Sequence, residues 1–154
     1  MRPIDSLMSE YGESHQNPTN KLLHWVCVPA IFFSIVGLLY ALKIPVNLTP
    51  DLQLNAAILV LFGVVIYYFR LSAPLAVGML LFSLVCLSLA QSIEETTYSL
   101  WKVSIAIFAV AWAVQFWGHK IEGKKPSFLK DIQFLLIGPA WLMHFIYKAL
   151  GIDY

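Results

Sequence analysis

Histidines and polar residues form a short cluster near the beginning of the sequence. His15 and His24 are separated by a segment that holds Asn17, Pro18 and Asn20. Asn17 followed by Pro18 is typical of a helix start, because asparagine caps the first turn and proline fits its first position. Asn20 and His24 then lie four residues apart on one helix face. The cluster therefore predicts an imidazole and an amide on the same face, with His15 just before the cap.

A second cluster near the end of the chain pairs His119 with Glu122. The two residues are three apart and share a face if the helix that contains them continues past Gly118. A histidine and a carboxylate at this spacing can bind the same metal ion, as they do in helical carboxylate-metal proteins. Imidazoles with a carboxylate suit iron, zinc or copper, and two histidines with one carboxylate suit non-haem Fe(II) and O₂. The spacing does not distinguish Fe(II) from Zn(II).

The composition indicates that these clusters belong to a membrane protein. Of the 154 residues, 59% are hydrophobic and 12% are charged, and the mean hydropathy is +0.72. Soluble domains carry about twice that charged fraction, so the excess apolar surface must face lipid. The net charge of +1 argues against a nucleic-acid partner. The length suits one integral membrane domain over residues 1–154.

The predicted fold class is all-α, a polytopic transmembrane helical bundle. Four apolar segments approach the roughly 20 residues needed to cross a bilayer, namely 22–42, 54–69, 74–91 and 101–118. A tight hairpin at 70–73 joins the second and third segments. Pro45 and Pro50 predict a turn region in the loop 43–53.

The last apolar segment, 132–150, is interrupted by Gly138–Pro139. Proline removes a backbone donor and clashes with the preceding turn, so the segment is either a kinked fifth span or two short helices that reverse at this point. A straight span places His144 about 20 Å deep, whereas a reversal brings it back toward the other histidines. We therefore predict four spans plus a segment broken at Gly138–Pro139, with five spans as the alternative.

The distribution of positive charge predicts the orientation of the chain. Lys43 and Lys102 fall on one side of the predicted membrane. Seven basic residues fall on the other, which places the N-terminus and both histidine clusters in the cytoplasm: Arg2, Lys21, Arg70, Lys120, Lys124, Lys125 and Lys130. A bacterial inner membrane and the endoplasmic reticulum are both compatible with this topology.

The two clusters together resemble a known family, the membrane-bound Fe(II)-dependent 2-hydroxy fatty acid dioxygenases. The family's first signature is matched by Tyr11, His15, Pro18, Asn20, His24, Val28 and Pro29. Its second signature is approached by Gln115, Phe116, Gly118, His119, Glu122, Lys125 and Pro126. Motif order and hydrophobic profile extend the resemblance over nearly the whole chain.

The resemblance implies an O₂-dependent α-oxidation in which a 2-hydroxy fatty acid yields a fatty acid one carbon shorter. It implies one Fe(II) ion, held or oriented by His15, His24, His119 and His144. Glu122 is then a ligand or a partner that fixes a histidine, and Asn20 a hydrogen-bond donor or acceptor for the substrate hydroxyl or a ligand. Lys120 or Lys124 would attract the substrate carboxylate, while the acyl tail lies among the spans.

Two other classes of function remain open from the sequence. A Zn(II)-dependent or other metal-dependent lipid hydrolase fits the same residues and requires no O₂. A small non-catalytic membrane protein, such as a transport subunit or assembly factor, predicts neither a bound metal nor a need for the histidines. The preferred acyl chain length and the oligomeric state are not specified by the sequence.

Overall fold

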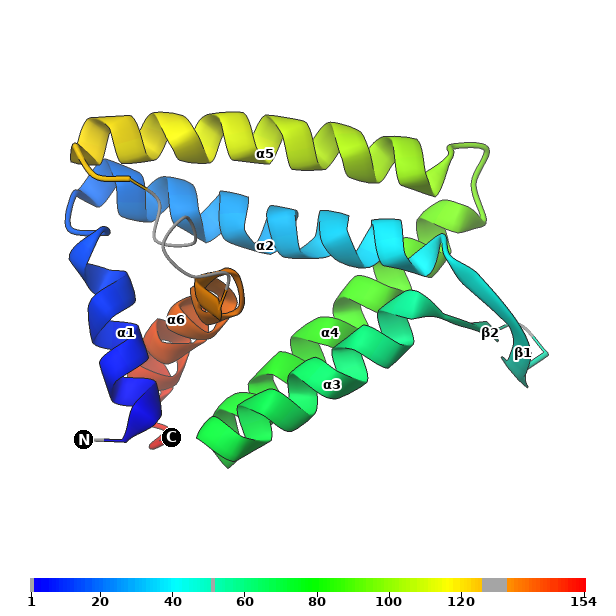
Figure 1. Cartoon of the computed structure of the whole chain (residues 1–154), viewed down its shortest axis with the longest axis horizontal. Coiled ribbons are helices and arrows are strands. Elements are labelled where there is room, and N and C mark those ends of the chain that lie inside the picture. Colours follow the sequence, from blue (N-terminus) through cyan, green and yellow to red (C-terminus); the bar gives the residue numbers. More distant parts are fainter. Residues whose placement is uncertain (1, 51, 126–132) are drawn as a thin grey trace.

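The computed structural model describes residues 2–50, 52–125 and 133–154. Pro126 and Lys130, which entered the sequence argument, lie outside this described part. Within it, the chain forms six helices and a two-stranded sheet (Figure 1). The helices are α1 (Pro3–Glu13), α2 (Pro18–Tyr40), α3 (Ala56–Leu71), α4 (Ala73–Glu94), α5 (Leu100–Glu122) and α6 (Gln133–Leu150), and the strands are β1 (Lys43–Thr49) and β2 (Leu52–Asn55).

Helices α2 and α5 form a long antiparallel pair that runs the length of the molecule (Figure 1). Two glycines let their backbones approach closely. A Cβ atom on Gly37 would overlap the Ser104 hydroxyl, and a Cβ on Gly118 would lie 2.6 Å from Oδ1 of Asn20. Small residues at helix contacts are typical of packing in membranes. The pairing brings the start of α2 beside the end of α5.

Local capping fixes where the key helices begin. The Asn17 side chain accepts hydrogen bonds from the backbone N–H groups of Thr19 and Asn20, with Pro18 at the first helical position. The predicted helix start is therefore confirmed. Ser72 caps α4 directly after α3 ends, so the predicted hairpin at 70–73 is also confirmed.

The segment predicted as a loop at 43–53 is mostly β structure, so the fold is not purely helical. β1 pairs with β2 in an antiparallel hairpin with register shifts, and Lys43 lies opposite Asn55. Ile44, Val46 and Leu48 alternate with polar residues and proline, a pattern that favours a strand. The prolines mark a turn region but do not prevent pairing, because a hairpin edge tolerates a missing donor.

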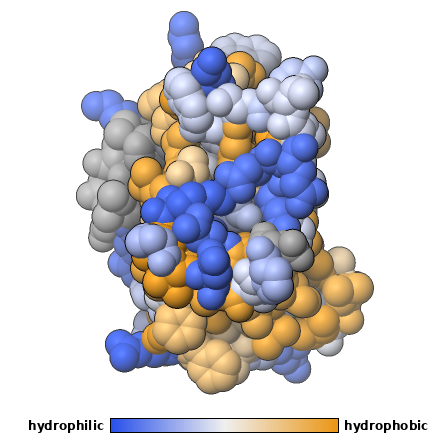
Figure 2. Space-filling view, turned by 90° about the vertical axis from the view of Figure 1, so that its right-hand side faces the viewer, coloured by the Kyte–Doolittle hydropathy of each residue, from blue (hydrophilic) through white to orange (hydrophobic). Residues whose placement is uncertain are grey.

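Three helices, α2, α4 and α5, are long and apolar enough to cross a membrane. The predicted second span is helix α3, whose 16 residues extend about 24 Å and fall short of a bilayer core. A count of four or five spans is therefore not established. Figure 2 views the end of the molecule that carries β1 and β2, where hydrophilic residues gather between hydrophobic flanks.

Helix α6 is continuous through Gly138 and Pro139, so the predicted break at Gly138–Pro139 is wrong. Both residues are buried. A Cβ on Gly138 would lie 3.0 Å from the Tyr11 hydroxyl oxygen and 3.4 Å from Cγ1 of Val28. The glycine therefore serves close packing of α6 against α1 and α2. Proline costs the helix one backbone hydrogen bond, which this packing offsets.

The close approach of α2 and α5 yields a first prediction. Replacing Gly37→Val should destabilise the fold by about 1–3 kcal/mol, because the added carbons overlap Ser104 in a packed interface. The matched control is Gly63→Val on α3, where a Cβ meets nothing within 4 Å. Thermal unfolding of both variants in detergent checks this, and equal midpoints would show that the α2–α5 contact is not tightly packed.

Candidate metal centre

Three histidines from separate parts of the chain converge at the α2–α5 junction. His15 lies in the turn between α1 and α2, His24 in α2 and His119 in the last turn of α5. Each offers a ring nitrogen that lies within 4.8 Å of the other two. Their exposed fractions are 1%, 0% and 3%. The prediction that the two distant clusters meet is confirmed for His15, His24 and His119.

Hydrogen bonds fix the ring orientations of His15 and His24. Nδ1 of His15 lies 2.6 Å from the Tyr11 carbonyl oxygen, and Nδ1 of His24 lies 2.8 Å from the Asn20 carbonyl oxygen. A carbonyl only accepts, so each Nδ1 must carry the hydrogen and donate it. Each neutral ring then has a lone pair at Nε2. The two Nε2 atoms face each other at 2.9 Å.

A proton does not readily bridge this pair. Burial, reinforced by the neighbouring His24, lowers the pKa of the His15 imidazole to about 3, so the ring is uncharged at neutral pH. Nδ1 of His119 is also buried and has no hydrogen-bond partner among the described residues. Three neutral imidazoles with facing lone pairs are a site for a cation.

The observed spacing fits a metal ion. Metal–imidazole bonds of about 2.0–2.1 Å separate two nitrogens by about 2.9 Å at the right angle of an octahedral site, which matches the Nε2–Nε2 distance, and by about 3.3 Å at a tetrahedral angle. The donor set suits iron, zinc, copper or nickel. Three protein ligands leave positions for other molecules, which is typical of catalytic rather than structural sites.

Glu122 does not belong to the histidine cluster but binds the turn between α1 and α2, which contains His15. Its carboxylate accepts hydrogen bonds from the backbone N–H groups of Gln16 and Asn17 at 2.9 and 2.8 Å. It also accepts one from Nδ2 of Asn20 at 3.1 Å. With three donors on its two oxygens, the carboxylate fastens the α1–α2 turn, and with it His15, to the end of α5.

Asn20 braces the same turn. Its Nδ2 donates to the Ser14 carbonyl oxygen at 3.2 Å as well as to Glu122, while Oδ1 is directed at Gly118. The side chain is fully buried. These contacts brace the turn, while Oδ1 has no hydrogen-bond partner among the described residues, and the role of Asn20 toward the substrate or a ligand stays a prediction.

The predicted substrate lysines lie away from the histidines. Lys120 is exposed, and Lys124 donates from Nζ to the Glu13 carbonyl oxygen at 2.7 Å, closing α1 onto the segment that follows α5. Neither side chain lines the cavity described below. Both lysines therefore lie at the surface of the protein, outside the cavity.

His144 does not join the other three histidines. It lies one turn beyond Trp141 on the unbroken α6, and its Nδ1 is paired with the Tyr154 hydroxyl. The predicted approach depended on a chain reversal that does not occur. Trp141 takes that place, with its ring centroid 5.3 Å from that of His15 and 5.5 Å from that of Tyr11. An aromatic residue in an apolar segment gave no sequence signal for this role.

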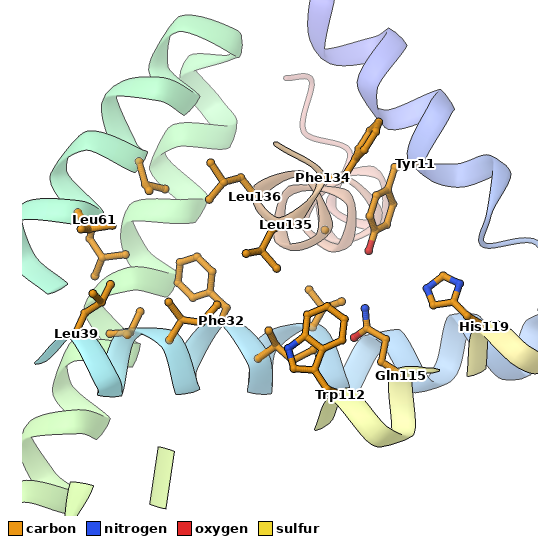
Figure 3. A pocket seen from close by; sticks show the side chains of 17 residues that line it. Tyr11, Phe32, Leu39, Leu61, Trp112, Gln115, His119, Phe134, Leu135 and Leu136 are labelled. Atoms are coloured by element: carbon orange, nitrogen blue, oxygen red, sulfur yellow. The ribbon is translucent and has the colours of Figure 1, made fainter. Parts of the chain in front are cut away.

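An apolar cavity of about 100 Å³ begins beside His119 and runs along α2 (Figure 3). Tyr11, Gln115 and His119 line the end nearest the histidines, and Trp112 lines it about two turns before His119 on α5. From Val28 to Leu39 the lining follows α2 over about 16 Å of helix rise. The remaining lining is hydrophobic and comes from α2, α3 and α6: Val28, Ile31, Phe32, Ile35, Val36, Leu39, Val60, Leu61, Val64, Phe134, Leu135, Leu136 and Gly138.

The carboxylate contacts yield a second prediction. Glu122→Gln should weaken Zn(II) binding about 10- to 100-fold, because an amide has one acceptor oxygen for three donors and releases the turn that positions His15. The exposed Glu10→Gln is the control. Competition with a chelator measures the affinity. Unchanged affinity in Glu122→Gln would show that the turn needs no such support.

Comparisons with known proteins identify the family of this chain. The family described as "2-hydroxy-palmitic acid dioxygenase Mpo1-like" matches residues 1–150. The chain is 31% identical over 148 residues to the 2-hydroxy-palmitic acid dioxygenase MPO1 of Saccharomyces cerevisiae, a match that covers 94% of this chain and 80% of that protein. No solved structure shows a significant match. Since the family match extends over nearly the whole sequence, the chain belongs to the Mpo1-like family of 2-hydroxy-palmitic acid dioxygenases.

Proposed function

We propose that this chain is an Fe(II)- and O₂-dependent dioxygenase that converts a 2-hydroxy fatty acid into a fatty acid one carbon shorter. The observation that carries the proposal is the pair of facing Nε2 atoms of His15 and His24 beside His119, which lines the end of an apolar cavity. The names of the family and of the yeast relative support the substrate class. With O₂ as the sole oxidant, the equation balances if the lost carbon leaves as CO₂ together with one water.

His15, His24 and His119 would hold the metal. Fe(II), when bound, supplies the activation of O₂ and open positions for the two oxygen groups of a 2-hydroxy acid. The protein contributes fixed, neutral imidazoles: the Tyr11 and Asn20 carbonyls hold the Nδ1 hydrogens, so both Nε2 lone pairs remain available. Glu122 and Asn20 keep the turn in register with α5.

The cavity suits the part of the acyl chain next to the head group. Its hydrophobic lining offers these carbons the contacts that they leave behind in lipid. The outer surfaces of α2, α4 and α5 carry exposed large apolar residues, such as Val26, Leu81 and Val110. A membrane-dissolved acid can therefore reach the site without its tail crossing water.

The position of each histidine predicts the metal content of variants. His15→Ala, His24→Ala and His119→Ala should each reduce bound iron well below one ion per chain and abolish turnover, because each removes one of three converging donors. His144→Ala should retain both, since its ring pairs with Tyr154. Metal analysis of the purified variants checks this. Iron loss in His144→Ala alone would overturn the assignment.

The reaction itself is tested with purified protein reconstituted anaerobically with Fe(II). On admission of O₂, 2-hydroxypalmitic acid should yield pentadecanoic acid, with one O₂ consumed per product. The same protein loaded with Zn(II) should yield none, because zinc has no redox chemistry. Pentadecanoic acid formed equally without O₂ or with Zn(II) would require another oxidant and would contradict the proposal, as would its absence with Fe(II) and O₂.

A further inference from the structure

Gln115 is a buried amide that the metal centre does not use. It lies on α5 four residues before His119, on the same helix face, and its exposed fraction is 5%. Its Oε1 is buried without a hydrogen-bond partner among the described residues. Buried amides in membrane helices ordinarily pair across a helix interface. This one instead lines the cavity beside His119 (Figure 3).

The Tyr11 hydroxyl approaches the same region from the opposite side. The Tyr11 ring stacks on His15 with centroids 4.2 Å apart and an interplanar angle of 13°. Its hydroxyl oxygen is the nearest atom to the space that a Cβ on Gly138 would fill, at 3.0 Å. Figure 3 shows the hydroxyl directed toward the end of the cavity where Gln115 and His119 lie.

The two groups differ in what they can offer a ligand. A glutamine amide carries an acceptor oxygen and two donor hydrogens, whereas the tyrosine hydroxyl donates one. They meet where the hydrophobic lining ends and the histidines begin. A ligand suited to this end has a hydrocarbon tail and a compact head that both donates and accepts hydrogen bonds. A 2-hydroxy acid has this chemistry, because its hydroxyl donates and its carboxylate accepts.

We infer that Gln115 and Tyr11 form the head-group subsite, in which Oε1 of Gln115 accepts the hydrogen bond of the 2-hydroxyl and the Tyr11 hydroxyl donates to the carboxylate. This inference rests on the proposed function and deepens it, because it assigns the selection of 2-hydroxylated over unsubstituted acids to Gln115. Sites that hydrogen-bond a substrate hydroxyl reject analogues that lack it, because the buried partner is then left unpaired.

The subsite is tested by binding under anaerobic conditions to the iron-loaded protein. Competition against a fluorescent fatty acid gives the dissociation constants of 2-hydroxypalmitic and palmitic acid. Gln115→Leu and the more flexible Gln115→Met should lower the preference for the 2-hydroxy acid about tenfold, because only that acid loses a hydrogen bond. The contribution of the metal to the preference is common to all variants and cancels.

Tyr11→Phe distinguishes binding of the carboxylate by Tyr11 from binding of the 2-hydroxyl by Gln115. Both acids carry a carboxylate, so this variant should weaken both to a similar degree and leave their ratio unchanged. Matched controls are Gln91→Leu on α4 and Tyr98→Phe, whose side chain is exposed. Iron content is measured for every variant and should equal that of the wild type, because neither Gln115 nor Tyr11 belongs to the histidine cluster.

The outcomes separate this inference from the proposed function. An unchanged ratio in both Gln115 variants, with iron and turnover intact, overturns the subsite and leaves the dioxygenase proposal standing. Equal weakening of both acids overturns it too, since Gln115 then only supports the cavity. If the wild type lacks O₂-dependent turnover but still prefers the 2-hydroxy acid through Gln115, the subsite stands and the proposed reaction fails.

Discussion

Two imidazoles that each donate their Nδ1 hydrogen to a backbone carbonyl have only lone pairs left to face each other. His15 and His24 are in this position, with Nε2 atoms 2.9 Å apart. Such a contact is unfavourable without a cation between the rings, so the surrounding structure must hold it. The turn between α1 and α2 is accordingly tied down at several points, and Glu122 alone receives three hydrogen bonds there. Much of the local architecture follows from the need to keep these lone pairs together.

The α2–α5 pair is the frame on which this arrangement depends. Gly118 lets α5 approach Asn20 closely, and the same approach brings His119 and Glu122 to the start of α2. At the other end of the pair, Gly37 permits contact with Ser104. A rotation of either helix would separate His119 from the other two histidines, so the packing of two apolar helices decides whether the polar centre exists. The packing of the apolar helices α2 and α5 therefore also determines the geometry of the histidine cluster.

Local rules made part of this structure predictable. The Asn17–Pro18 cap, the shared face of His119 and Glu122, and the Ser72 turn all depend on residues within four positions of one another. The errors arose where tertiary packing decides. Gly138–Pro139 predicts a break in the helix, yet α6 continues through both residues, and Gly138 packs closely against Tyr11. The predicted approach of His144 to the site depended on that reversal, and the structure places His144 outside the histidine cluster.

The difference between local spacing and tertiary packing also applies to Glu122, Asn20 and Gln115, whose hydrogen-bond partners the sequence does not reveal. Spacing identifies which polar residues share a face, but not which of them are already satisfied by other parts of the chain. Both oxygens of Glu122 accept hydrogen bonds from the α1–α2 turn and Asn20, and Nδ2 of Asn20 donates to Ser14 and Glu122. Gln115, which lies on the same helix as Glu122, keeps an unpaired buried oxygen at the end of an apolar cavity. In a dry site a polar group without a partner is costly, and a ligand that supplies the partner removes that cost. The unpaired groups, rather than the paired ones, therefore define what the cavity selects.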